Sequence, residues 1–265
     1  DSSFYYNYYD LKSNSGWTDL YTLIDTLNNY VSNVDNILNV DRSLWMHAFN
    51  YTLINFDSYV GYGQNYYLYQ GLSNQFHPIL WDLNMSFGGF RLTDATQSYF
   101  NGFNISQAQT MDPLNFLNNN FLSPRPLITK LLSNSRHQRM YLAHMRTIVE
   151  EHFSNQSYIT RAQYLQNLIS NDVQNDNNKF YSYNDFLDNI NNQVNIPSSV
   201  CPGISQLMDA RTTFLTNYWS GFIQPNISNI QTLPNSSQIF GNDLTITAQI
   251  QDANYAMLSY RFGEN

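Results

Sequence analysis

The chain has 265 residues, enough for one large domain, or one domain with a small appendage, that buries its own core. Lys and Arg number 12 against 20 Asp and Glu, the net charge is −8, and basic residues form no run. Such a chain is not built to neutralise a phosphate backbone, so we expect no nucleic-acid partner. The single cysteine, Cys201, excludes an intramolecular disulfide and a cysteine-based zinc site.

Two further expectations come from hydropathy and from the first residue. The sequence has no apolar stretch of about 18 residues, the least that spans a bilayer as a helix, so no membrane span is predicted. It starts at Asp1 without an initiator Met or a signal-peptide pattern. We therefore expect a processed or truncated chain with a segment missing upstream.

Two helices and a hairpin are predicted in the first part of the chain. Apolar residues recur at helical spacing over residues 17–30 and 41–56, and Asp41 is placed to cap the second helix. That helix runs directly into Asp57. After a glycine-containing turn, residues 66–69 and 76–83 read as two short strands of one hairpin.

The second part is predicted to be helical up to residue 223. Residues 101–126 lack periodicity and read as a long loop, and helical spacing then returns in several segments. These are residues 127–132, 136–153, 159–173 and 204–222, with a shorter helix at 181–190.

A polar, Pro- and Ser-containing linker is predicted at 224–240. Beyond it, apolar and polar residues alternate over 244–250 and again over 256–262, which predicts a β-hairpin or the start of an Ig-like β-sandwich at 241–265. The fold class is therefore α+β, with a main domain at 1–223.

Oxygen-bearing side chains stand at the ends of the elements around the first hairpin. They belong to Asp57, Asn65, Asp82 and Asn84. Hard cations such as Mg²⁺ take carboxylate and amide oxygens and need only one or two acidic ligands from the protein. Asp57, Asn65 and Asp82 occur in the same order as the catalytic Asp, the metal-binding Asn and the metal-binding Asp of protein kinases, although the spacings are longer here. The alternative is structural: Asp57 caps a turn and Asp82 makes a strand-end hydrogen bond.

Three sequence blocks around these residues resemble the CotH spore-coat kinase family. That family reads W-D-x-Y, H-N-Y-Y-L-Y and P-W-D-L-D-x-x-F-G, and this chain has Phe56-Asp57-Ser58-Tyr59, Gln64-Asn65-Tyr66-Tyr67-Leu68-Tyr69 and Ile79-Leu80-Trp81-Asp82-Leu83-Asn84 with Phe87-Gly88. Looser similarity covers residues 11–14, 127–151 and 210–215. Roughly residues 10–220 resemble the family.

The resemblance implies a secreted or cell-surface bacterial protein kinase, of which this chain is the C-terminal, metal-binding half. Its fold would be a mainly helical, kinase-like C-lobe with a small hairpin at the metal site, and the N-terminal lobe would be missing. Asp57 would be the catalytic residue, and Asn65 and Asp82 would bind ATP through Mg²⁺ or Mn²⁺, with Asn84 as a further metal ligand. The partner would be a protein with a Ser or Thr acceptor.

The sequence departs from the family pattern at three positions, and one of them, Asn84, favours a second hypothesis, as do the expected missing upstream lobe and the predicted C-terminal β-module. Gln64 replaces the usual His, Leu80 replaces Pro, and Asn84 replaces an Asp, which removes a carboxylate from the site. The alternative is therefore a catalytically inactive, kinase-derived structural or adhesive surface or coat protein. A third hypothesis, a carbohydrate-binding module, rests only on the richness in tyrosine.

The remaining histidines and aromatic residues are interpreted as structural. His47, His137, His144 and His152 are spread over predicted helices without a third ligand near any pair. Tyr66, Tyr67 and Tyr69 alternate along a strand and are expected to pack in the core and across strands, and Trp81 is expected in the core.

Overall fold

The computed structural model of the chain divides into two compact units, Asp1–Thr216 and Asn217–Asn265. It describes residues 2–14, 16–94, 102–114, 122–196, 199–222, 225–233, 243–253, 256 and 258. The predicted domain boundary after residue 223 stays a prediction.

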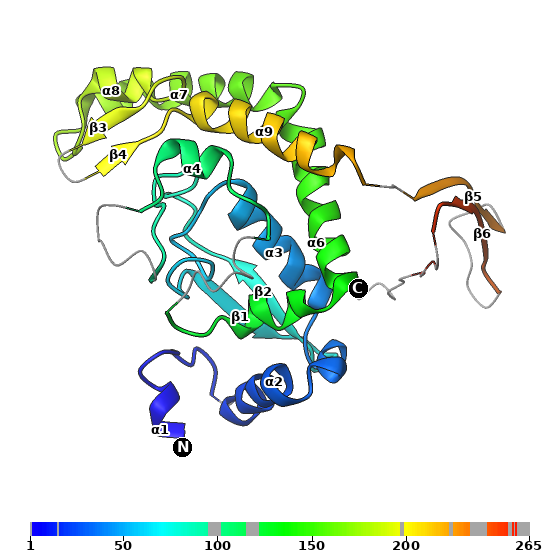
Figure 1. The fold of residues 1–265 in the computed structure, drawn as a ribbon. Coiled ribbons are helices and arrows are strands. Elements are labelled where there is room, and N and C mark those ends of the chain that lie inside the picture. Colours follow the sequence, from blue (N-terminus) through cyan, green and yellow to red (C-terminus); the bar gives the residue numbers. More distant parts are fainter. Residues whose placement is uncertain are drawn as a thin grey trace. The chain divides into compact units, whose positions relative to one another are not determined.

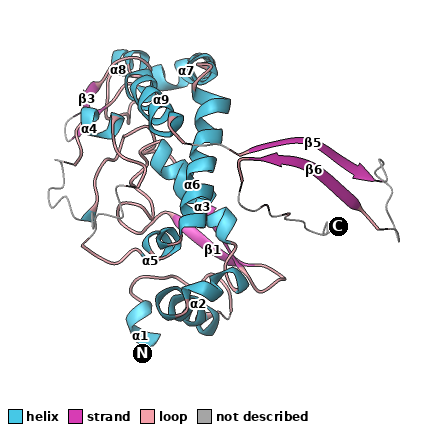
Figure 2. Cartoon of the chain, turned by 45° about the vertical axis from the view of Figure 1, so that its right-hand side comes forward, coloured by secondary structure: helices cyan, strands magenta, loops and turns pink. Residues whose placement is uncertain are grey.

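The first unit is mainly helical, with two small antiparallel hairpins (Figures 1 and 2). Its first half comprises α1 (Ser2–Tyr5), α2 (Trp17–Asn29), a 3₁₀ helix (Val31–Asn36), α3 (Val40–Thr52), β1 (Tyr66–Gln70), β2 (Phe76–Leu80) and α4 (Ile105–Gln109). Its second half comprises α5 (Pro126–Thr129), a 3₁₀ helix (Leu131–Ser133), α6 (Ser135–Ile148), a π-helical turn (Val149–Phe153), α7 (Ser157–Asn175), α8 (Tyr183–Asp188), β3 (Val194–Ile196), β4 (Ser199–Cys201) and α9 (Ile204–Ser220), whose last turn belongs to the second unit.

Helix α3 is the central element of the core and packs against α6. The predicted cap at Asp41 is wrong, because the Asn39 side chain accepts a hydrogen bond from the Arg42 N–H at 2.9 Å. Asp41 instead lies in the first turn, where its carboxylate is 2.9 Å from His144 Nε2. The helix also ends earlier than predicted, at Thr52.

The hairpin β1–β2 forms where it was predicted, although β2 ends at Leu80 and not at residue 83. Tyr66 pairs with Leu80 at one end and Gln70 pairs with Phe76 at the other. A tight turn closes the second end, with the Gly71 N–H bonded to the Gln75 carbonyl at 3.0 Å. Phe76 is buried against the core, and the hairpin packs on α3.

The elements of the first unit that were not predicted include α1, the 3₁₀ helix Val31–Asn36, α4 and the hairpin β3–β4. Helix α4 lies inside the expected long loop and starts with a capping box of Asn104 and Gln107, which satisfies N-terminal N–H groups. The short hairpin β3–β4 precedes α9, with Val194 paired to Cys201. Residues 115–121 of the expected loop fall outside the described residues.

Arg211 of α9 is buried and joins three parts of the first unit. Its guanidinium donates to the carbonyls of Tyr51 and Thr52, at 2.9 Å each, at the C-terminus of α3. It also donates to Ala108 at 3.0 Å and Met111 at 3.2 Å, at the end of α4. Burial lowers the pKa of Arg211 to about 10, so the side chain stays charged at neutral pH. Helix C-termini carry partial negative charge, which offsets the cost of burying this cation.

The second unit contains an antiparallel ribbon of β5 (Asn226–Leu233) and β6 (Thr245–Gln251), with Ile227 opposite Ile250. The sequence predicted residues 226–233 as linker and the segment 256–262 as the partner of β6. The structure pairs β6 with β5 instead, and most of 256–262 lies outside the described residues. A complete β-sandwich stays a prediction.

The predicted fold class, α+β, is confirmed by this mainly helical arrangement with small antiparallel hairpins. In the part of the chain that the structure describes, no helix is both long and apolar enough to cross a membrane.

We predict that Arg211→Met lowers the free energy of unfolding by about 3–5 kcal/mol, because four buried carbonyls lose their donor. Urea unfolding followed by circular dichroism measures this. Arg139→Met is the control, since Arg139 lies exposed on α6. Equal stability of the two variants would contradict the role given to Arg211.

Candidate functional site

Asn65 and Asp82 lie at the same end of the β1–β2 hairpin. Asn65 immediately precedes Tyr66, whose partner is Leu80, and Asp82 follows shortly after Leu80. Both residues have left-handed backbone, with φ of 54° for Asn65 and 51° for Asp82. Asn and Asp tolerate this conformation better than most residues, and it turns the chain away from the strands. The antiparallel pairing therefore brings the start and the exit of the hairpin together, as the sequence interpretation required.

Asp57 is tied to this end of the hairpin by side chains of the neighbouring loop. Asn65 Nδ2 donates to the Asp57 carbonyl at 2.9 Å. The Gln64 side-chain amide donates to Asp57 Oδ1. Gln64, one of the three departures from the family pattern, is thus the hydrogen-bond partner of the candidate catalytic carboxylate. With its nitrogen turned to Asp57, Asn65 has its Oδ1 left to coordinate a cation.

Asp82 and Asn84 are exposed. Within the described residues neither side chain makes a hydrogen bond, so the strand-end bond of the structural alternative is not found for Asp82. Their oxygens are open to solvent and to ligands. Asn84 lies in the turn that follows, and no described contact joins it to Asn65.

Main-chain hydrogen bonds join the segment before Asp57 to the segment after Asp82. The Gly88 N–H bonds to the Ile54 carbonyl at 3.2 Å, and the Phe56 N–H bonds to the Phe90 carbonyl at 3.2 Å. Gly88 has φ of 73°, and a Cβ there would come within 3.1 Å of Leu207. Ile54 has φ of 50°, a strained value for a β-branched residue that is fully buried. The two loops are therefore held as one unit.

A family model described as CotH kinase protein matches residues 2–215. The match covers well over half of the chain and includes all three motif blocks around the hairpin. The chain belongs to the CotH kinase family. This confirms the predicted resemblance and gives the chain a kinase-type function at the level of the family. No curated protein sequence matches the chain.

The donor set of this CotH kinase family member suits a hard divalent cation. The Asp82 carboxylate and the amide oxygens of Asn65 and Asn84 are the kind of oxygen ligand that Mg²⁺ accepts while keeping water and phosphate in its other positions. Among the described residues no group of three or more His, Cys, Asp or Glu is placed to hold a metal. A site in this chain would therefore depend on the amide of Asn65 and on ligands from a nucleotide.

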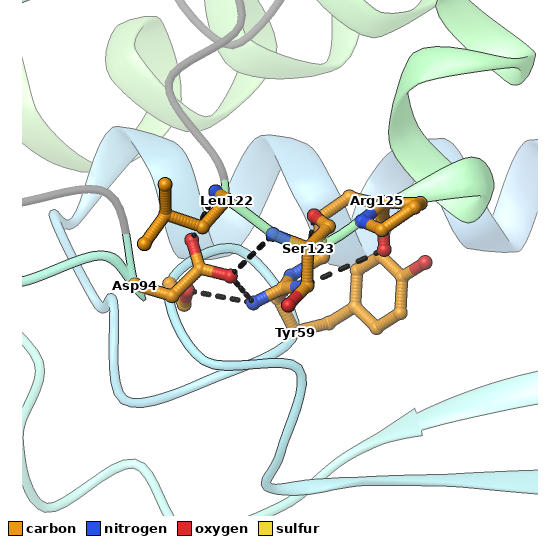
Figure 3. Close-up of polar contacts among 7 residues, drawn as sticks. Tyr59, Asp94, Leu122, Ser123 and Arg125 are labelled. Carbon is orange, nitrogen blue, oxygen red and sulfur yellow. Dashed lines mark hydrogen bonds and ion pairs between the residues drawn. The ribbon is translucent and has the colours of Figure 1, made fainter.

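Arg125 supports the loop between Asp57 and Asn65 and was missed in the sequence. Its guanidinium donates to the carbonyl of Tyr59 at 3.2 Å and to that of Gly61 at 3.0 Å, and it forms an ion pair with Asp94 at 3.1 Å (Figure 3). Both side chains are largely buried, which strengthens the pair. The only sequence signal was an Arg between two prolines in a segment taken for a loop.

The Asp94 carboxylate also accepts the N–H groups of Leu122, at 3.0 Å, and Ser123, at 2.9 Å (Figure 3). It thereby fixes the chain that leads into Arg125. A single carboxylate thus positions the guanidinium and the backbone beside it.

His47 supports the same loop from α3. Its Nε2 lies 2.9 Å from the Leu127 carbonyl, and the Leu127 N–H donates to the Tyr59 hydroxyl at 3.0 Å. Burial lowers the pKa of His47 to about 4, so the ring is neutral and Nε2 carries the hydrogen that it donates. Its Nδ1 is buried without a partner among the described residues.

Of the other histidines, His77 lies on β2 opposite Tyr69, and the remaining three lie outside the hairpin. His137 is buried, with Nδ1 at 2.9 Å from the Leu131 carbonyl. His144 stacks on Trp45 with ring centroids 4.1 Å apart. His152 is exposed at the π-helical turn.

The prediction that Trp81 lies in the core is wrong, because 56% of the residue is exposed. It packs edge-on against Tyr67 of the facing strand, with ring centroids 5.0 Å apart. Tyr69 is also exposed, whereas Tyr66 faces inward, with its hydroxyl 3.1 Å from that of Tyr9. The prediction that these tyrosines pack in the core and across strands is therefore wrong for Tyr69, and the outer face of the hairpin is an open aromatic surface next to Asn65.

We predict that His47 makes the protein less stable as the pH falls from about 6.5 to about 4. In that window the unfolded chain binds a proton at this residue and the folded chain does not, so protons favour unfolding by up to about 3 kcal/mol. In His47→Gln, whose amide can still donate to Leu127, the loss of stability between pH 7 and pH 4.5 should shrink by about 2 kcal/mol.

Urea unfolding at several pH values measures this. His152→Gln, at an exposed histidine, should keep the wild-type pH dependence. A slope that is unchanged in His47→Gln would show that this ring does not stay neutral in the folded state.

Proposed function

We propose that this chain transfers the γ-phosphoryl group of ATP, with Mg²⁺ or Mn²⁺, to a Ser or Thr hydroxyl of a secreted or cell-surface bacterial protein. The observation that carries the proposal is the convergence of the candidate residues at one end of the hairpin. Asn65 is bonded to Asp57, and the strand register brings Asp82 to the same end. Phosphoryl transfer needs mainly such positioning and charge compensation.

Asp57 would act on the acceptor. Its Oδ1 is engaged by Gln64, which leaves Oδ2 to take the proton of the Ser or Thr hydroxyl. The hydroxyl oxygen then bonds to the γ-phosphorus, and the bond from that phosphorus to the β–γ bridging oxygen breaks, releasing ADP. A divalent cation would supply charge compensation at the phosphates, and Asn65 and Asp82 would hold it, with Asn84 as a further oxygen donor.

The exposed aromatic surface suits the nucleobase. Tyr67 and Trp81 lie on the outer face of the hairpin at its Asn65 end, and each leaves ring surface open to solvent. Any nucleobase can stack on such rings, because every base has a π-face. A nucleotide whose phosphates reach Asn65 and Asp82 could place its adenine there.

The alternative function, an inactive kinase-derived structural or adhesive protein, is favoured by one observation. Asn84 is exposed and carries no charge where the family pattern has an acid. The experiment on Asp57 and Asp82 below separates the two.

We predict that Asp57→Asn lowers kcat for phosphate transfer by about 10²- to 10⁴-fold while affinity for MgATP is kept. Asp82→Asn should instead abolish most Mn²⁺ binding, measured by electron paramagnetic resonance. It should also abolish most of the rise in Tm that MgATP produces. Both are measured in the natural full-length protein. Asp172→Asn, at an exposed position of α7, should change neither.

Phosphate transfer that persists in Asp57→Asn and Asp82→Asn would contradict the roles assigned to these residues. Absence of both transfer and Mn²⁺ binding in the wild type would favour the inactive alternative.

We predict that Trp81→Ala weakens ATP binding by roughly tenfold or more, since base stacking contributes about 1–3 kcal/mol. Titration of the full-length protein with MgATP, followed by calorimetry, gives the Kd. Tyr69→Ala removes an exposed ring from β1, nearer the turn end of the hairpin, and should leave the Kd unchanged. If the two variants bind ATP equally well, the base lies elsewhere.

A further inference from the structure

An apolar cleft of about 570 Å³ lies beside α7, away from the hairpin face that carries Trp81. One wall is a single face of α7, because its residues recur at helical spacing. The opposite wall comes from α8, β3 and the start of α9. Lining residues include Ala162, Leu165 and Ile169 on α7 and Phe186, Val194 and Ile204 opposite them.

The wall formed by α7 remains open to solvent. None of the residues of α7 whose burial is described is fully buried, and Leu165 and Ile169 keep 41% and 44% of their surface exposed. Clefts of this size with mainly apolar walls and a few polar groups are typical of binding sites. Contiguous apolar surface left in water is unusual unless a partner covers it.

Most polar side chains of the lining are already engaged within the protein. Gln166 donates to the Phe186 carbonyl at 2.7 Å, and Asn189 donates to the Pro202 carbonyl at 3.0 Å. The Tyr158 hydroxyl donates to Asp209 at 2.6 Å. These groups fix the walls and leave little capacity for a polar ligand.

Charge at the cleft comes from two residues. The Asp185 carboxylate caps α8 by accepting the N–H and hydroxyl of Ser182. Arg161 is different: its guanidinium lies 5.3 Å from the ring centre of Tyr164, and within the described residues it has no ion pair or hydrogen bond. An apolar cleft with one available cation suits a ligand that combines an apolar group with a nearby carboxylate.

Phe87 connects this cleft to the candidate site. Its side chain lines the cleft, and the next residue, Gly88, is bonded to Ile54 just before Asp57. Of the two substrates of the proposed reaction, ATP is a polyanion and does not suit apolar walls. A polypeptide can bring apolar and acidic side chains together with a hydroxyl.

We propose that the α7 cleft binds the polypeptide that presents the acceptor hydroxyl, through an apolar side chain in the cleft and an acidic residue at Arg161. The proposal rests on the proposed function for the identity of the occupant. Binding at the cleft does not require the phosphate to move, so the two can be tested separately.

The probe is a pool of synthetic peptides with one fixed Ser and all other positions randomised, retained on immobilised full-length protein carrying Asp57→Asn. Retained peptides should be enriched in Phe, Leu or Ile at one position and in Asp or Glu nearby. Leu165→Asp should lower their retention roughly tenfold or more. Leu168→Asp is the matched control, since Leu168 lies exposed on α7 outside the cleft and should have no effect.

Arg161→Glu should exchange the preference for acidic residues for a preference for Lys or Arg, an outcome that misfolding cannot produce. The proposal is overturned if no position is enriched, or if Leu165→Asp and Leu168→Asp act alike. It is also overturned if a fluorescent long-chain fatty acid binds in a Leu165-dependent way and no peptide does.

The same pool with labelled ATP and the unsubstituted protein separates the two proposals. Peptides that bind in the cleft but receive no phosphate would leave the docking site standing and refute the proposed function. Phosphate transfer without sequence preference would support the proposed function and refute the docking site.

Discussion

Arg211 places a charged guanidinium in the interior, where water cannot solvate it, and its hydrogen bonds go to main-chain carbonyls at two helix ends. In this position it holds the C-terminus of α3, from which the chain proceeds through Ile54 to Asp57. Because four carbonyls share one cation, α3, α4 and α9 cannot shift independently without leaving polar groups unpaired. Arg211 does not line the candidate site, but it holds the end of the helix from which the chain runs to Asp57.

The helices could be predicted because burial of one face imposes a period on the sequence. Residues 17–30 correspond closely to α2, and residues 136–153 correspond to α6 with the π-helical turn after it. Elements without that signal were missed: β3 and β4 are too short to show alternation, and α4 is set by its capping box. The pairing of β5 with β6 was not predicted, for another reason. Strand β5 is rich in Asn and Ser and almost wholly exposed, so nothing in its composition distinguishes it from a linker.

The candidate site was predictable to the extent that it follows from strand pairing and family motifs. Asn65 and Asp82 flank the hairpin in sequence, and antiparallel pairing must bring such positions together. Arg125 and Arg211 could not be found in the same way, since their partners are mostly backbone carbonyls, which every residue has. The exposure of Trp81 was also hidden, because a strand pattern reports that two faces differ and does not say whether the second is covered.

The turn at the far end of the hairpin has a consequence for the candidate ligands Asn65 and Asp82. Gly71 to Gln75 closes the loop and so fixes which residues of β1 and β2 face each other. That turn lies about 17 Å along the strands from Asn65. An insertion or deletion there would slide one strand past the other, move Asp82 relative to Asn65 by about 3.4 Å per residue and reverse the faces of the slipped strand. The spacing of the candidate ligands therefore depends in part on the length of a loop in which none of them stands.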